Sequence, residues 1–222
     1  MFDWGDILII GDSFAGSRSM ATDWPKHLTC KLTGLSTDIG ISPLGKGFNG
    51  CSWWSARSCL LEELSKRKPK VLIIAHTEPS RLPNDKNLPL NAMTVQERET
   101  FTTNPEHEDL RLAAKNYYKY LMSTEFHIWS QQQWFHELDR IVEKENIPYV
   151  VHLHCFMPYT PDLYVFKHGI TFDTPLWEIS DDIKKWNNSN RNHFTVENNI
   201  KLSNIIYNGI QNYSNGIRKL NL

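Results

Sequence analysis

The stretch that decides the fold is Asp6-Ile-Leu-Ile-Ile-Gly-Asp-Ser-Phe14, close to the start of the chain. Its first half is a short apolar run rich in β-branched side chains, which is typical of a strand buried on both faces in a parallel sheet. Gly11 ends the run, and Asp12 and Ser13 favour a turn. The stretch therefore predicts a first buried strand that delivers a serine to the carboxyl end of a sheet.

Helical and strand patterns alternate along the rest of the sequence. Helices are predicted over about 23–32, 52–66, 107–122, 129–145 and 195–213, and two more buried strands over 70–75 and 148–153. Strands separated by helices indicate a mostly parallel sheet with helices on both faces, in a single α/β domain over residues 1–222. Such folds place their sites beyond the carboxyl ends of the strands. The long connections at 77–106 and 155–192 are candidates for a lid or a substrate wall.

The composition is that of a globular chain without a strong electrostatic field. Hydrophobic residues make up 40% of the sequence, and 24 basic against 25 acidic residues give a net charge of -1. We therefore expect neither nucleic acid nor an anionic membrane as a partner. The sequence shows no secretory signal and no apolar run of roughly 18 residues, so we expect a cytoplasmic protein. Its four cysteines lack C-x-x-C spacing, which indicates reduced thiols.

Ser13 and His193 form the candidate catalytic pair. A serine at the end of a strand becomes a nucleophile when a histidine takes its proton and N–H donors face the developing oxyanion. His193 stands just before the last predicted helix, and the base can enter from any point of the chain if the geometry closes. Taken alone, Gly-Asp-Ser also fits an ordinary turn, and His193 also fits a surface histidine.

Three blocks of sequence, in this order, resemble the SGNH (GDSL-type) hydrolase superfamily. They are Gly11-Asp-Ser-Phe14, Gly47-Phe-Asn-Gly-Cys-Ser-Trp-Trp-Ser55 and Arg191-Asn-His-Phe-Thr-Val-Glu-Asn-Asn199. The last two blocks are similar to members encoded by bacteriophages and marine microbes. The resemblance implies a flavodoxin-like three-layer α/β/α fold and esterase, lipase or carbohydrate deacetylase activity. We expect no cofactor.

The resemblance also implies an oxyanion hole built from the N–H of Ser13, the N–H of Gly50 and an asparagine side chain. Gly47 is the alternative glycine. The position that matches the asparagine is Glu78, and an ionised carboxylate only accepts hydrogen bonds. We therefore expect Glu78 either to be protonated or to turn away and pair with Arg81, and we favour the pairing.

A second departure from the family concerns the histidine. The family's orienting aspartate lies three residues before its histidine, and this sequence has Asn190 there. An amide can orient the imidazole of His193 but cannot offset the charge of the imidazolium. This departure leaves two hypotheses open. The first is an esterase that removes a small acyl group from a carbohydrate or another small substrate. The second is a non-catalytic glycan-binding or virion-associated module on the same scaffold.

Other side chains near the predicted site have more than one interpretation. Asp12 is expected to shape the turn, and together with Trp53 and Arg81 it is a candidate for contact with substrate. Trp53 fits either sugar stacking or core packing. His152 and His154 share one face of a predicted strand, but no third ligand stands at a characteristic spacing, so we expect no metal.

Overall fold

The structure is a computed structural model. It describes residues 1–16, 23–37, 43–45, 47, 51–84, 88, 90–92, 94–96, 104–156, 163–179, 194–213 and the backbone of 219–220. Five strands form one parallel sheet in chain order. They are β1 (Ile7–Gly11), β2 (Val71–His76), β3 (Tyr149–His154), β4 (Ile170–Phe172) and β5 (Lys219–Leu220).

A further segment extends the sheet beyond β1. Leu44 and Gly47 form isolated parallel bridges to Leu8 and Gly11. The chain therefore passes from β1 outward to the 44–47 segment and then back across β1 to β2. This reversal makes the carboxyl ends of β1 and β2 the topological switch point, where open α/β sheets bind their ligands.

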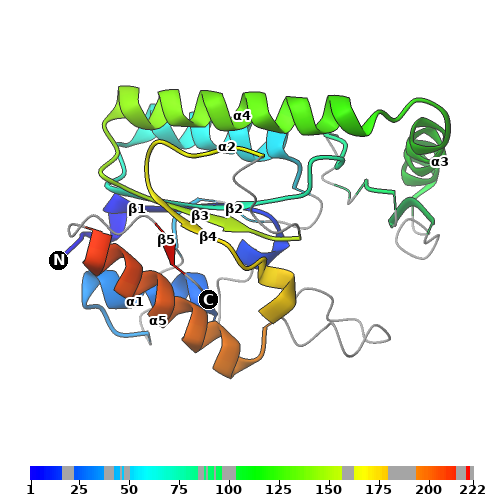
Figure 1. The fold of residues 1–222 in the computed structure, drawn as a ribbon. Coiled ribbons are helices and arrows are strands. Elements are labelled where there is room, and N and C mark those ends of the chain that lie inside the picture. The colour runs from blue at the N-terminus through cyan, green and yellow to red at the C-terminus, as the bar shows by residue number, and fades with distance from the viewer. Residues whose placement is uncertain are drawn as a thin grey trace.

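Helices cover both faces of the sheet, as Figure 1 shows. The helices α1 (Trp24–Thr33) and α5 (Val196–Tyr213) lie on one face, and α2 (Trp53–Lys66) and α4 (Thr124–Glu145) lie on the other. The helix α3 (Pro105–Tyr120) lies beyond the sheet at one end of α4. Short 3-10 turns occupy Trp4–Asp6, Ser13–Ala15, Thr94–Gln96 and Leu176–Ile179. The predicted three-layer α/β/α architecture is confirmed.

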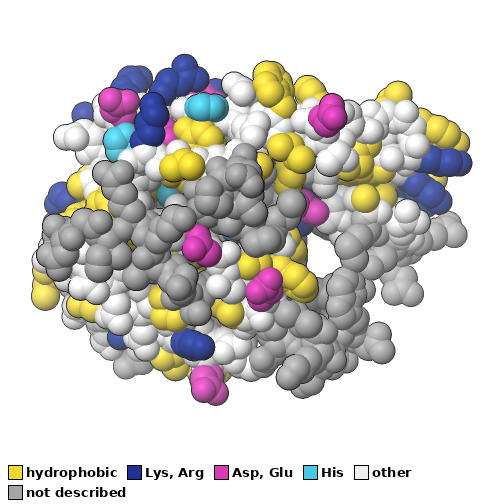
Figure 2. Space-filling model, viewed as in Figure 1, with side chains coloured by type: hydrophobic (Ala, Val, Ile, Leu, Met, Phe, Trp, Pro, Cys, Tyr) yellow, Lys and Arg dark blue, Asp and Glu magenta, His cyan; other side chains and the backbone are white. Residues whose placement is uncertain are grey.

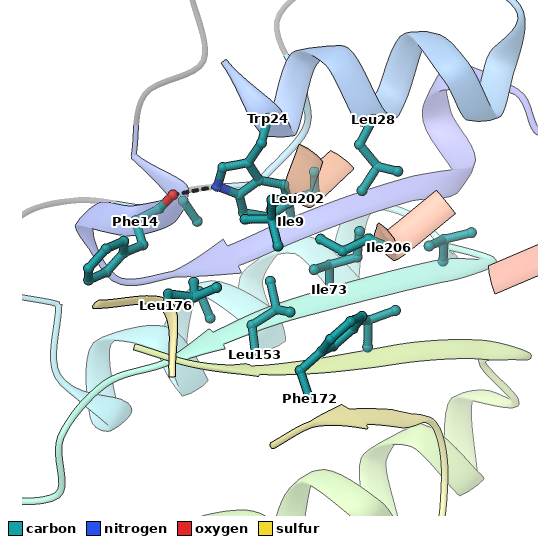
Figure 3. Close-up of a cluster of buried hydrophobic side chains, with 14 of the residues drawn as sticks. Ile9, Phe14, Trp24, Leu28, Ile73, Leu153, Phe172, Leu176, Leu202 and Ile206 are labelled. Carbon is teal, nitrogen blue, oxygen red and sulfur yellow. Dashed lines mark hydrogen bonds between the residues drawn. The ribbon is translucent and has the colours of Figure 1, made fainter. Parts of the chain in front are cut away.

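Strand alternation divides the core into two clusters, one on each face of the sheet. Ile9 and Ile73 point toward α1 and α5, and they belong to the cluster of Figure 3. Leu8 and Leu72 point the other way, toward the face covered by α2 and α4. Burying one such side chain stabilises the fold by about 1.5–3 kcal/mol. The sheet is therefore held from both sides, which fixes the strand ends that carry the site.

The indole of Trp24 connects α1 to the turn after β1. Its ring lies in the cluster of Figure 3 together with Leu202 and Ile206 of α5. Its Nε1 donates a hydrogen bond of 2.6 Å to the carbonyl oxygen of Phe14. Because Phe14 follows Ser13 directly, this bond ties the helix layer to the turn that carries the serine.

The predicted elements agree with the structure to within a few residues, and three short pieces of the sheet were not predicted. These pieces are β4, β5 and the 44–47 segment. The predicted connection over 155–192 is therefore not one loop, because it contains β4 and the 3-10 turn at Leu176–Ile179. All four cysteines carry free thiols. None of the described helices is long and apolar enough to cross a membrane.

Candidate functional site

Ser13 lies at the switch point, on the first residue of the 3-10 turn that follows β1. Gly11 makes the turn possible, because its φ is 132° and a Cβ there would lie 2.2 Å from the carbonyl oxygen of Ala75. A side chain at this position would collide with the backbone of β2. The N–H of Asp12 then donates to the same Ala75 oxygen at 3.1 Å. The turn that carries Ser13 is thus fixed against the end of β2.

Asp12 is the centre of the hydrogen-bond network at this point. The residue has no exposed surface. Its Oδ1 accepts a bond of 2.8 Å from Ser13 Oγ and another from the Ser13 N–H. Its Oδ2 accepts from Thr77 Oγ1 at 2.6 Å and from Arg81 Nη1 at 2.7 Å. Both carboxylate oxygens are therefore occupied by donors of the protein itself.

Arg81 brings a buried positive charge to the same carboxylate. Its second terminal nitrogen, Nη2, lies 3.1 Å from Glu78 Oε1, and its guanidinium lies over the ring of Phe156, 5.2 Å from the ring centre. Burial acts to lower the pKa of Arg81, but the negative charges of Asp12 and Glu78 outweigh it and the pKa is raised. The predicted pairing of Glu78 with Arg81 is confirmed.

The loop after β2 is held in place by α3 and α4. Gln131 Nε2, on α4, donates to the carbonyl oxygen of Thr77 at 2.8 Å. Tyr118 Oη, on α3, lies 2.7 Å from the carbonyl oxygens of both Ser80 and Leu90, which share its one hydrogen. These bonds fix the backbone at Thr77 and at Ser80, next to Arg81, and so position the two residues that reach Asp12.

The structure assigns different surroundings to the residues predicted to contact substrate. Asp12 is buried and holds the Ser13 turn, so the expectation that it shapes the turn is confirmed. Trp53 is half-buried and packs against the core cluster beneath α2 and α4. The neighbouring Trp54 is exposed, with the Arg57 guanidinium 5.0 Å from its ring centre. Substrate contact by Asp12, Trp53 and Arg81 stays a prediction.

Part of the predicted catalytic machinery lies outside the described residues. His193, Asn190 and Gly50 belong to this part. Gly47 is described and lies against the serine turn, where a Cβ would come within 2.5 Å of the Ala15 backbone. The Ser13 N–H, predicted to face an oxyanion, donates to the Asp12 carboxylate in this structure. The pairing of Ser13 with His193 stays a prediction.

A cluster of three buried histidines, which we call the histidine cluster, lies at the ends of β2 and β3. It consists of His76, His152 and His154. His76 Nε2 lies 3.1 Å from His152 Nδ1, and His152 Nε2 lies 3.0 Å from the carbonyl oxygen of His168. Burial lowers the pKa of His152 and of His154 to about 3, and it lowers the pKa of His76 well below its ordinary value. The rings are therefore neutral at physiological pH.

The histidine cluster is a packing and hydrogen-bonding feature in this structure. The ring of Phe166 stacks on His152 at 3.6 Å between centres, and Phe135 packs edge-on against His76. Within the described part of the chain, no group of three or more His, Cys, Asp or Glu side chains is placed to hold a metal ion. The sequence pointed to His152 and His154 but not to His76, which the parallel register sets beside His154.

Comparison with known proteins finds a distant likeness. No family model matches the chain, and no curated protein matches it. Among solved structures, the chain is similar to the crystal structure of an acetyl xylan esterase, with a TM-score of 0.36 and 15% sequence identity. The match covers 97% of this chain and 77% of that chain. At this TM-score the likeness assigns no activity.

Proposed function

We propose that the protein is a serine hydrolase of carboxylic esters, with Ser13 as the nucleophile and His193 as its base. The observation that carries the proposal is the place of Ser13. Its hydroxyl stands at the switch point of the sheet and is hydrogen-bonded to a fully buried carboxylate. A serine held at this place, where α/β folds bind their ligands, is suited to attack a bound substrate.

In the proposed reaction, a ring nitrogen of His193 takes the hydroxyl proton as Ser13 Oγ bonds to the ester carbonyl carbon. The intermediate collapses, the alcohol leaves with the proton from His193, and an acyl-serine remains. Water then attacks the acyl carbon and gives a proton to His193. The intermediate collapses to the carboxylic acid, and His193 returns the proton to Ser13 Oγ, which restores the serine. Because the hydroxyl donates to Asp12 in the structure, its hydrogen must turn toward His193 before the attack.

The N–H groups of Gly50 and Ser13 are the proposed oxyanion donors. In the structure the Ser13 N–H donates to Asp12, so it serves the oxyanion only after leaving that carboxylate. Glu78 is drawn away by Arg81 and by Asn91 Nδ2, which donates to Glu78 Oε1 at 2.8 Å. We propose a small acyl group, such as acetyl on a carbohydrate, as the group removed.

The test is hydrolysis of a chromogenic acetyl ester, together with labelling of the protein by a fluorophosphonate probe and identification of the labelled residue. We expect Ser13→Ala and His193→Ala to abolish activity to a similar extent, and the double variant to be no worse, because residues that act as a unit are not additive. Ser58→Ala, which removes an exposed serine on α2, is the matched control and should keep full activity.

Two results would contradict the proposal. One is a wild-type protein that neither hydrolyses the ester nor takes up the probe at Ser13. The other is a double variant that loses far more activity than either single variant, since the two side chains would then act separately. Retained binding of a glycan by an inert wild type would favour the non-catalytic module instead.

A further inference from the structure

Ser13 and Arg81 bind opposite oxygens of one carboxylate. Ser13 Oγ donates to Asp12 Oδ1 at 2.8 Å, and Arg81 Nη1 donates to Asp12 Oδ2 at 2.7 Å. The serine follows β1 and the arginine follows β2, so the Asp12 side chain joins the two strand ends at the switch point. Any effect of this contact on Ser13 must therefore pass through Asp12.

We propose, building on the proposed function, that Arg81 is a positioning residue, which keeps Asp12 ionised and thereby holds the Ser13 turn at the end of β1. A buried carboxyl group without a counter-charge favours its neutral form. An ionised carboxylate only accepts hydrogen bonds, so the Ser13 hydroxyl must donate to it. A protonated Asp12 would be a weaker acceptor and would hold the N–H and the hydroxyl of Ser13 less firmly. The charge of Arg81 thus sets how firmly Asp12 holds the turn that places Ser13 Oγ.

The other groups that face Asp12 do not take over this role. Glu78, after β2, is negative and opposes the ionisation of Asp12, while Thr77 is a neutral donor. The thiols of Cys51, before α2, and Cys155, after β3, lie within electrostatic reach, and burial raises the pKa of each, which keeps both neutral. Among the described residues, Arg81 is therefore the cation that balances Asp12.

Contacts on three sides fix the guanidinium of Arg81. Asp12 holds Nη1, Glu78 holds Nη2, and the ring of Phe156 lies against the plane of the group. Only 4% of the residue is exposed. The cation is therefore in place before any substrate arrives, as a positioning residue requires.

The decisive comparison is Arg81→Gln, which keeps a donor without charge, against Arg81→Lys, which keeps the charge. We expect Arg81→Gln to lower kcat by about 10- to 100-fold with little change in KM, because Ser13 Oγ is held less precisely while substrate binding is unchanged. Its kcat should also rise with pH more steeply than that of the wild type, as Asp12 loses its proton. Arg81→Lys should restore part of kcat and the wild-type pH profile.

The matched control is Arg111→Gln. Arg111 is also buried and paired, with Nη2 at 2.7 Å from Glu108 Oε1 and Nη1 at 2.8 Å from the carbonyl oxygen of Val95, but it lies on α3. We expect this variant to lose thermal stability and to keep the kcat and pH profile of the wild type. A shared loss of kcat in both variants would indicate a general structural effect and would overturn the inference.

Infrared spectroscopy gives a readout that does not depend on catalysis. At neutral pH, Arg81→Gln should show the carbonyl stretch of a protonated carboxyl group, which the wild type and Arg81→Lys lack. The band should vanish in the double variant Asp12→Asn/Arg81→Gln. If the wild type neither hydrolyses esters nor binds the probe, the proposed function fails, and this band still decides whether Arg81 keeps Asp12 ionised.

A double-variant comparison covers the case in which Arg81→Gln does not fold. Asp12→Asn removes the charge that Arg81 balances, so adding Arg81→Gln should change kcat no further. A further loss in the double variant would show that Arg81 acts directly on the substrate, which would overturn the inference. The inference would also be overturned by an Arg81→Gln variant that keeps the wild-type kcat and pH profile, or by one that lacks the infrared band.

Discussion

We expect the histidine cluster to make the protein lose stability steeply in mild acid. The folded rings of His152 and His154 have a pKa of about 3, because burial disfavours the imidazolium, whereas an exposed histidine has a pKa of 6.5. The unfolded chain therefore binds more protons than the folded chain at any pH between these values. The free energy of unfolding therefore has its full value above about pH 6.5, where the histidines are neutral in both states, and it falls as the pH drops toward 3.

The hydrogen bonds of the cluster also explain why His152 resists protonation. The carbonyl oxygen of His168 only accepts, so Nε2 of His152 carries the hydrogen and its Nδ1 accepts from Nε2 of His76. A proton added at His152 Nδ1 would face the N–H of His76. The neutral pair is thus fixed in one tautomer, and charging His152 breaks the bond between the two rings.

The expected loss is large compared with the total stability of a domain. Between about pH 7.5 and about pH 5, each of the two histidines should lower the free energy of unfolding by about 2 kcal/mol. Together they should lower it by about 4 kcal/mol, whereas the total for a domain is typically about 5–15 kcal/mol. His76, whose pKa is also lowered by burial, adds to the same loss. Urea unfolding across this pH range measures the dependence directly.

A pair of variants tests whether the histidine cluster causes this loss of stability in acid. His154→Gln should flatten the dependence of the unfolding free energy on pH by about 1.2 kcal/mol per pH unit near pH 5.5. The control His107→Gln, on α3 and away from the cluster, should leave the dependence as in the wild type. Parallel curves for the wild type and His154→Gln would refute the reasoning.

Three further changes test the site. Glu78→Gln should leave the pH profile of ester hydrolysis where it is, since Glu78 is paired with a cation; extension of activity to higher pH would indicate a protonated donor instead. Asn190→Asp should raise kcat, because a carboxylate stabilises the imidazolium of His193, and a folded variant without any gain would speak against this. Gly11→Ala should lower the melting temperature sharply, because the added Cβ meets the Ala75 oxygen at 2.2 Å; an unchanged melting curve would be incompatible with the turn described.

The sequence predicted those parts of the fold that depend on local signals. The helix α1 follows Asp23 as N-cap and ends at Gly34, whose φ is 73°. The helix α2 follows Ser52, whose side chain accepts from the N–H of Ser55. By contrast, β4 spans three residues, which is too short for an alternating pattern to stand out. It forms because β3 offers an open edge beside it.

The site shows the same division between local and distant signals. The Glu78–Arg81 pair was predictable because its members lie three residues apart. The bond between Asp12 and Arg81 joins residues 69 positions apart, and it depends on β1 and β2 being neighbours in the sheet. No spacing of residues in the sequence predicts such a contact. The one available signal was that both residues follow buried strands, whose carboxyl ends meet at a common edge.

The occupied carboxylate of Asp12 also limits how the protein can be re-engineered. Loops beyond the strands of α/β folds are often treated as modules that can be exchanged to change specificity. Here the segment after β2 supplies Thr77 and Arg81 to the residue that holds Ser13. A transplanted loop would have to begin after Arg81. Grafts that replace 77–81 would detach the serine from its support, whatever new specificity they carried.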